Sequence, residues 1–69
     1  MYKIKEETLG RVDKALLSGV TPGDLDKAIR NAMKAKNVEK KDYYSLMVPN
    51  ADRNSWIGLN IPKENITHD

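Results

Sequence analysis

The chain has 69 residues, of which 39% are hydrophobic and 32% are charged, and its formal net charge at pH 7 is +2. This length supports one small domain, and the hydrophobic content is too high for a disordered segment. Cysteine is absent, so disulfides and thiolate metal ligands are excluded, and no apolar run approaches the roughly 18 residues of a membrane span.

The domain is expected to comprise residues 1–62, followed by a flexible C-terminal tail at residues 63–69. The first residues contain no apolar run of signal-peptide length, so we expect a cytoplasmic protein. Residues 2–4 alternate between apolar and polar side chains and are a candidate short strand.

Residues 6–18 form the first predicted helix. Leu9, Val12 and Leu16 recur at three- and four-residue intervals, which is typical of a helix with one apolar face. Gly19 is expected to end this helix by taking the left-handed conformation that closes many helix C-termini.

A second helix is predicted to start at Pro22. Thr21 is a suitable N-cap, proline fits the first helical position, and Asp24 suits the positive end of the helix dipole. Along this helix the apolar and the basic residues separate onto opposite sides. The apolar side holds Leu25, Ala28, Ile29, Ala32 and Met33, and the basic side holds Lys27, Arg30 and Lys34.

Residues 43–48 and 56–61 are predicted to form a β-hairpin, because both runs are rich in aromatic, β-branched and other apolar residues and a polar segment separates them. Side chains alternate along a strand, so one face should pack against the helices, with Met47 and Trp56 on the other. The packed face should carry Tyr44, Leu46, Val48, Ile57, Leu59 and Ile61. The expected fold class is α+β, with two main helices followed by a hairpin.

The charges are unevenly distributed. Residues 27–41 contain six basic side chains and one acidic one, a local net charge of +5, whereas the chain from residue 42 onward has two basic and four acidic side chains. A basic stretch of this kind is a candidate surface for a polyanion, and its alternative is an ordinary solvated helix face.

Few residues are suited to catalysis. The only histidine, His68, lies beside the C-terminus, and Asp24 and Asp26 are two apart on a predicted helix, so their side chains diverge. Residues 19–23 contain two glycines, but no Gly-Lys-Ser/Thr follows to complete a phosphate-binding loop. We therefore expect no enzyme activity, no cofactor and no metal site.

Residues 15–29 carry the pattern of a helix-turn-helix. This motif needs a small residue where the helices approach, a glycine in the turn, an apolar residue after it and two apolar anchors in the second helix. These places are filled, in order, by Ala15, Gly19, Val20, Leu25 and Ala28. The segment resembles the helix-turn-helix of phage repressors and looks most like that of the Cro repressors of lambdoid phages, whose hairpin turn is similar to Asn50-Ala51-Asp52.

Two residues depart from that pattern. Lys14 and Ser18 occupy places where a helix-turn-helix normally has apolar side chains. A plain helical hairpin, closed by Gly19 and capped by Thr21, would produce much of the same sequence and is the alternative interpretation.

The resemblance implies a small transcription regulator, a repressor that binds double-stranded DNA as a homodimer with the second helix in the major groove. Lys27 and Arg30 could then donate to guanine, and Asp26 could accept from cytosine. The predicted DNA-binding residues are Thr21, Asp26, Lys27, Arg30, Lys34, Lys36, Lys40 and Lys41, with Arg53 and Asn54 at the hairpin tip.

Tyr43, Met47 and Trp56 have two interpretations. Large side chains usually fill the core of so small a domain. Alternatively, they form an exposed hairpin face that pairs with a second copy or makes the chain a protein-binding module or small inhibitor. A third hypothesis, RNA binding by stacking on Tyr43 and Tyr44, is weakened because adjacent strand residues point to opposite faces.

Overall fold

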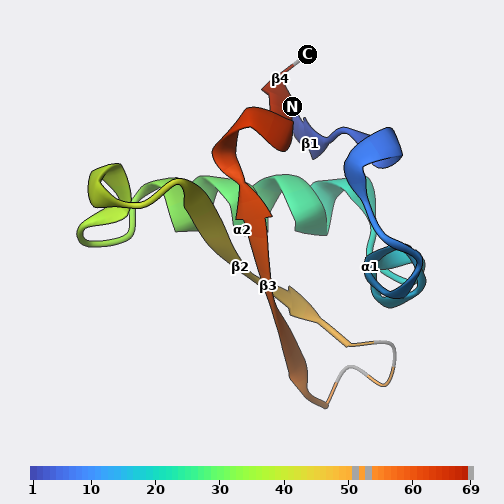
Figure 1. Ribbon diagram of the computed structural model, residues 1–69. Helices are drawn as coiled ribbons and strands as arrows, with labels where there is room; N and C mark the ends of the chain where they lie inside the picture. The colour runs from blue at the N-terminus through green and yellow to red at the C-terminus, as the bar shows by residue number, and fades with distance from the viewer. Residues whose placement is uncertain (51, 53, 69) are drawn as a thin grey trace.

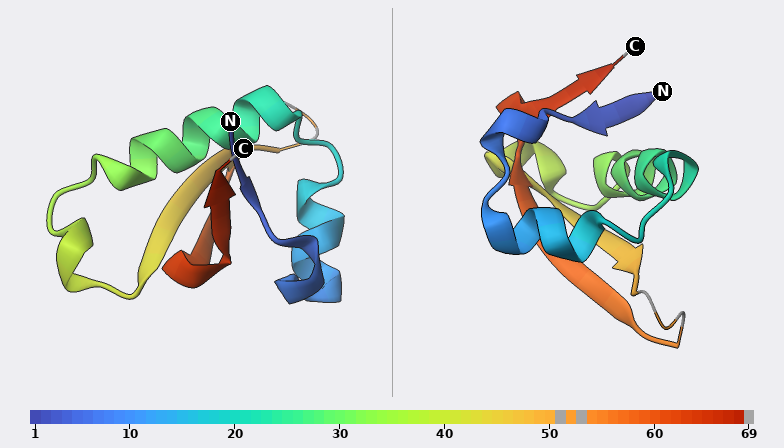
Figure 2. Two further views of the ribbon diagram at one scale, coloured as in Figure 1. Left: turned by 90° about the horizontal axis from the view of Figure 1, so that it is seen from above. Right: turned by 90° about the vertical axis from the view of Figure 1, so that its right-hand side faces the viewer.

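The computed structural model describes residues 1–50, 52 and 54–68. Helix α2 (Pro22–Met33) lies between a hairpin made of β2 (Tyr43–Pro49) and β3 (Trp56–Pro62) and a ribbon made of β1 (Tyr2–Ile4) and β4 (Ile66–His68) (Figure 1). Helix α1 (Arg11–Leu17) lies beside the start of α2 and runs across its direction (Figure 2). The expected α+β class, with two helices, a hairpin and a short N-terminal strand, is confirmed.

The start of α2 is built as predicted. Thr21 Oγ1 accepts a hydrogen bond of 3.1 Å from the Asp24 N–H, and Pro22 lies at the first position of the helix. Beyond the C-cap residue Lys34, Asn37 adopts the left-handed conformation with φ 63° and leads into the 3-10 turn Val38–Lys40. Asparagine tolerates this conformation better than most residues, so the chain turns toward the hairpin here with little steric strain.

The hairpin has the predicted strands and the predicted faces. β2 and β3 pair antiparallel, with Leu46 opposite Leu59 and Met47 opposite Gly58. The inner face against α2 carries the side chains expected there, which are Tyr44, Leu46, Val48, Ile57, Leu59 and Ile61. Met47 and Trp56 are exposed on the outer face, as their alternation with the inner set predicts.

The core lies between α2 and the hairpin. Ile29, Leu46 and Val48 are fully buried there. The other buried members are Ile4, Ala28, Ala32, Leu59 and Ile61. Burying one large aliphatic side chain stabilises a fold by about 1.5–3 kcal/mol, so this contact is the main source of stability in the molecule.

The two ends of the chain pair with each other, which differs from the prediction. β1 forms at the predicted residues and pairs antiparallel with β4, with Tyr2 opposite His68 and Ile4 opposite Ile66. Residues 63–68, expected to belong to a flexible tail, form the 3-10 turn Lys63–Asn65 and β4. The backbone groups of β1 need hydrogen-bond partners once Ile4 is buried in the core, and β4 supplies them.

The first helix is shorter than the predicted range of residues 6–18. A 3-10 turn at Glu6–Thr8 comes first, and α1 begins only at Arg11, after Gly10 in an extended conformation. Glycine has a low propensity to continue a helix and is accepted at an N-cap, so the apolar periodicity is interrupted there.

The predicted left-handed cap at Gly19 is wrong. No glycine in the described part of the chain has a positive φ. Instead, α1 ends at Leu17, and both the N–H and the hydroxyl of Ser18 donate to the Ala15 carbonyl. The side chain of Ser18 thus satisfies a carbonyl that the glycine cap was expected to satisfy.

Helix α1 is loosely packed. None of its residues is buried, and Val12 is 70% exposed. A cavity of about 580 Å³ lies among α1, β1 and the start of α2. Its apolar lining includes Ile4, Leu9, Leu17, Val20 and Leu25. The N-terminal part of the molecule therefore borders a pocket that is open to solvent.

Candidate nucleic-acid interface

The side of α2 that faces away from the hairpin carries basic and amide side chains. Lys27, Asn31 and Lys34 are all exposed, and their spacing of four and three residues places them on one helix face. In the right-hand view of Figure 2 no described element covers this side of α2. The seven-residue step from Lys27 to Lys34 corresponds to a rise of about 10 Å along the helix axis, which is the length of about three base pairs of DNA.

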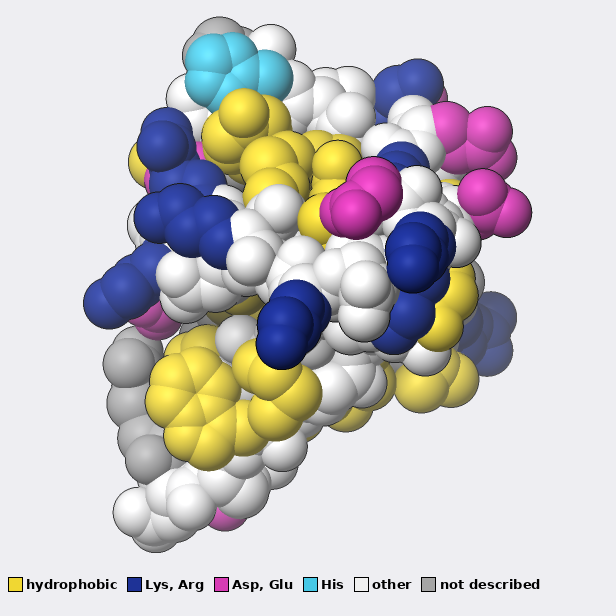
Figure 3. Space-filling view, turned by 90° about the vertical axis from the view of Figure 1, so that its left-hand side faces the viewer, with side chains coloured by type: hydrophobic (Ala, Val, Ile, Leu, Met, Phe, Trp, Pro, Cys, Tyr) yellow, Lys and Arg dark blue, Asp and Glu magenta, His cyan; other side chains and the backbone are white. Residues whose placement is uncertain are grey.

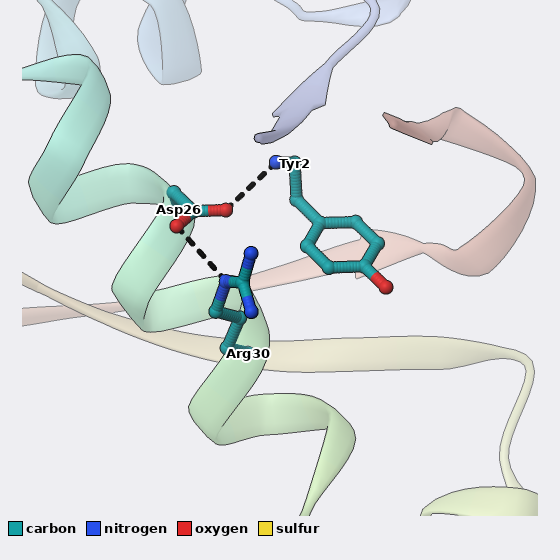
Figure 4. A network of polar contacts seen from close by, with 3 residues as sticks. All are labelled: Tyr2, Asp26 and Arg30. Atoms are coloured by element: carbon teal, nitrogen blue, oxygen red, sulfur yellow. Dashed lines mark hydrogen bonds and ion pairs between the residues drawn. The ribbon is translucent and has the colours of Figure 1, made fainter. Parts of the chain in front are cut away.

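Asp26 lies at the edge of this face and is engaged inside the protein. Its Oδ1 accepts a hydrogen bond of 2.7 Å from the Tyr2 N–H, and its Oδ2 accepts one of 3.0 Å from Arg30 Nε (Figure 4). The Asp26 side chain is only 17% exposed. Asp26, which is predicted to contact cytosine, therefore has a structural role in the free protein, where its carboxylate ties β1 to α2.

The same contacts lower the pKa of Asp26. The hydrogen bond from the Tyr2 N–H is the largest cause, burial acts in the opposite direction, and the hydrogen bond and charge of Arg30 lower the pKa further. The ionised carboxylate is therefore the form that the fold prefers.

Arg30 is held toward β1 while remaining accessible. Its guanidinium carbon lies 5.4 Å from the centre of the Tyr2 ring, and the Tyr2 ring in turn packs against His68 at a centroid distance of 4.5 Å. The Arg30 side chain is still 53% exposed. Of the three basic residues predicted on α2, Lys27 and Lys34 are exposed. Arg30 contacts Tyr2 of β1 and is also partly exposed to solvent.

The remaining predicted lysines lie beyond the C-terminal end of α2. Lys36, Lys40 and Lys41 are exposed in the segment that leads from α2 to β2. Lys41 Nζ lies 5.7 Å from the centre of the Tyr43 ring, so part of this positive charge adjoins the outer face of the hairpin. The structure thus places these lysines next to two surfaces, the helix end and the hairpin.

The other predicted contact residues are divided between the helix start and the hairpin tip. Thr21 is exposed, and its hydroxyl oxygen is engaged as the N-cap of α2. Asn54 is exposed, and its N–H donates to Asp52 Oδ1 at 2.9 Å. Arg53 and Ala51 lie outside the described residues. Thr21 thus belongs to the start of α2, whereas Asn54 belongs to the loop between β2 and β3.

The connection between the helices has the length of a helix-turn-helix. Residues 18–21 join α1 to α2 and include Gly19. Val20 and Leu25 are half-buried and Ala28 is buried, as the motif requires. Ala15 differs, because it is exposed instead of lying at a close contact between helices.

Met47 and Trp56 do not fill the core. Trp56 is 66% exposed and Met47 is 55% exposed, while Tyr43 is half-buried on the same outer face. The interpretation of these side chains as core residues is wrong for Met47 and Trp56, because the narrow space between α2 and the hairpin is already occupied by the inner face. Figure 3 shows hydrophobic side chains gathered over the hairpin, with Lys and Arg side chains above them.

Sequence analysis missed Asn31 as a candidate site residue. Its position four residues after Lys27 and three before Lys34 was the available signal, since such residues share a helix face. Asparagine can bond adenine through two hydrogen bonds, so its presence between two lysines adds base-reading capacity to the face.

Comparisons with models of protein families, with curated proteins and with solved structures find no match for this chain. Within the described residues, no helix has the length and apolar character required to cross a bilayer, and no three acidic or histidine side chains gather into a metal site. Function is therefore inferred from the surfaces of the molecule itself.

Proposed function

We propose that the protein is a small transcription regulator that binds double-stranded DNA with the outer face of α2 in the major groove. The observation that carries this proposal is the exposure of Lys27 and Asn31 on one face of the 12-residue helix α2, with the exposed C-cap residue Lys34 continuing that face. Lysine donates to guanine O6 and N7, and asparagine pairs with adenine N6 and N7. The opposite side of the same helix is anchored by buried Ile29, so the face is presented by a rigid element.

The surroundings of α2 support the same proposal. The four residues between α1 and α2 match the turn of a helix-turn-helix. Lys36, Lys40 and Lys41 extend the positive charge past the end of α2, where they can meet phosphates. A regulator of this kind needs no cofactor and would act in the cytoplasm, like the phage repressors that residues 15–29 resemble.

Arg30 and Asp26 have different roles in this proposal. Arg30 keeps enough exposed surface for a phosphate or base contact, whereas Asp26 fixes its direction through the ion pair of 3.0 Å. Asp26 also neutralises part of the charge of Arg30, so Lys27 and Lys34 supply more of the free positive charge of the face.

The test is the fluorescence anisotropy of a labelled random duplex at two salt concentrations, followed by selection from a random duplex library. We expect binding that weakens with salt and an enriched short motif. A palindromic motif would indicate that two copies bind together, since a two-fold dimer places its recognition helices about one DNA turn apart.

The decisive variants are Lys27→Ala/Lys34→Ala and, as a control, Lys3→Ala/Lys5→Ala, which removes the same charge from β1 and the residue that follows it. Lys27→Ala/Lys34→Ala should lower the salt slope of duplex binding by about one unit per lost phosphate contact. If the lysines contact bases instead, the free energy of binding should fall by about 1–3 kcal/mol per lost contact. Absence of duplex binding at low salt, or equal losses in both double variants, would show that the proposal is wrong.

A further inference from the structure

We propose that the outer face of the hairpin is a second binding surface, for single-stranded nucleic acid, on which unpaired bases stack. This goes beyond duplex binding by α2, because α2 packs on the inner face of the hairpin (Figure 2), whereas Lys27 and Lys34 are exposed on the side of α2 opposite its buried residues. A helix seated in a groove would leave the hairpin's outer face uncovered.

The outer face is a narrow strip with an aromatic ring near each end. Trp56 lies opposite Pro49 near the tip, and Tyr43 lies opposite Pro62 at the base. Tyr43 and Pro49 are the first and last residues of the seven-residue strand β2, a separation of about 20 Å along the strand. This length suits several extended nucleotides, close to the lower end of the range of about 4–16 nucleotides that single-strand-binding folds cover.

A glycine lies on the outer face two residues after the tryptophan. Met47 faces Gly58 across the hairpin, and the Met47 sulfur lies 3.4 Å from the place where a Cβ of residue 58 would stand. The methionine side chain thus lies over Gly58, and the Trp56 side chain projects from the same face two residues away. A planar base can therefore approach the exposed indole, which is 66% accessible.

The middle of the strip is polar. Ser45 Oγ donates a hydrogen bond of 3.0 Å to Asn60 Oδ1, and both residues are exposed. A protein-binding hot spot usually concentrates its large apolar groups at the centre and leaves polar groups at the rim. Here the aromatic rings lie at the ends and the polar pair lies between them, which suits a ligand with separated flat groups joined by a polar backbone.

The charge beside the strip favours an anionic ligand. Lys41 Nζ lies 5.7 Å from the Tyr43 ring, and Lys36 and Lys40 are exposed in the same connecting segment. None of the described outer-face residues of the two strands is acidic. Two copies packed on this face would bring like charges together, so a polyanion is the better occupant. Stacking on aromatic rings beside lysines is the usual mode of single-strand binding.

The test uses Trp56 as the probe, since it is the only tryptophan. Titration with a 12-nucleotide oligo(dT) should quench its fluorescence in a saturable way, and an equal titration with polyglutamate should not. Parallel titration with oligo(U) distinguishes DNA from RNA as the source of the unpaired bases. Quenching by polyglutamate alone would identify an acidic protein as the ligand and overturn the proposal.

The matched variants are Trp56→Leu and Trp56→Phe, followed by the anisotropy of a labelled oligo(dT). Loss of the stacking ring should raise the Kd about tenfold in Trp56→Leu, and phenylalanine should restore part of the affinity. The Kd of Lys27→Ala/Lys34→Ala for oligo(dT) should stay within about twofold of that of the unmodified chain, and Trp56→Leu should keep its affinity for duplex DNA. The two variants therefore test the two proposed surfaces independently.

Equal oligo(dT) affinity of Trp56→Leu and the unmodified chain would overturn the proposal. So would a concentration-dependent dimer in which Trp56 is shielded from an aqueous quencher, because a second copy would then occupy the face. Circular dichroism of each variant confirms that the fold is retained.

Discussion

The unit formed by α2 and the hairpin and the segment that precedes it are held together in different ways. The first has three fully buried side chains, Ile29, Leu46 and Val48, at its centre. The second, residues 7–20, has no residue in the buried core and borders a pocket of about 580 Å³. Both proposed binding surfaces lie on the well-packed unit. In so small a chain, rigid presentation of a surface requires the few core residues beneath it.

The largest predicted effect is on the free energy of unfolding, and it is tested by substituting one leucine from each region. Leu46→Ala removes a fully buried side chain between α2 and the hairpin and should cost about 2–5 kcal/mol, much of the total stability of a domain of this size. Leu16→Ala in α1 removes a side chain that is already exposed and should cost less than about 1 kcal/mol. Urea unfolding measures both. Equal losses would mean that α1 is packed more tightly than the structure shows.

The second prediction concerns the helix start that supports the DNA-binding face. Thr21→Ala removes the oxygen that accepts the Asp24 N–H and should cost about 1 kcal/mol, whereas Thr21→Ser keeps the cap. As a control in the loosely packed region, Thr8→Ala removes an exposed hydroxyl bound to the Lys5 carbonyl and should cost less than about 0.5 kcal/mol. Thermal unfolding of the three variants measures these losses of stability. A loss in Thr8→Ala as large as that in Thr21→Ala would contradict the predicted difference between the start of α2 and the loosely packed region.

The well-packed unit is also the part that sequence predicts best. The cap at Thr21, the apolar stripe of α2 and the alternation in the hairpin are local patterns, and each has the period of the element that it forms. The exposure of Lys27 and Lys34 follows from the same helical period. Local patterns therefore predict both the core and the outer face of α2.

The features that sequence analysis missed depend on distant contacts or single backbone conformations. Pairing of β1 with β4 joins residues at opposite ends of the chain, and the engagement of Asp26 follows from it, because the donor is the Tyr2 N–H. The break at Gly10 and the left-handed Asn37 each depend on one residue within otherwise unremarkable segments. The hydrophobic periodicity of a sequence contains no signal for a contact between distant residues or for the backbone conformation of a single residue.

The third prediction tests the link between the two regions through Asp26. Because folding lowers the pKa of this carboxyl, its contribution to stability is present above the ordinary value of 3.8 and is lost as the pH falls below that value toward the folded pKa. Asp26→Asn keeps an oxygen that can accept from the Tyr2 N–H but cannot ionise. The stability of the unmodified chain should therefore exceed that of Asp26→Asn at neutral pH and approach it as the pH falls below about 4. Urea midpoints at several pH values measure this difference, and parallel curves would show that the Asp26 charge does not stabilise the fold.

The smallest predicted effect comes from the largest side chain. Trp56→Leu changes a residue that is 66% exposed on the outer face of the hairpin, so the free energy of unfolding should change by less than about 0.5 kcal/mol. Ile61→Val removes one methylene from a buried residue on the inner face of the same strand and should cost about 0.5–1.5 kcal/mol. Urea unfolding of the two variants compares the two faces directly. If Trp56→Leu costs more than Ile61→Val, the indole is part of the fold; if it costs less, folding does not require a tryptophan at this position, and its exposed ring is available for a ligand.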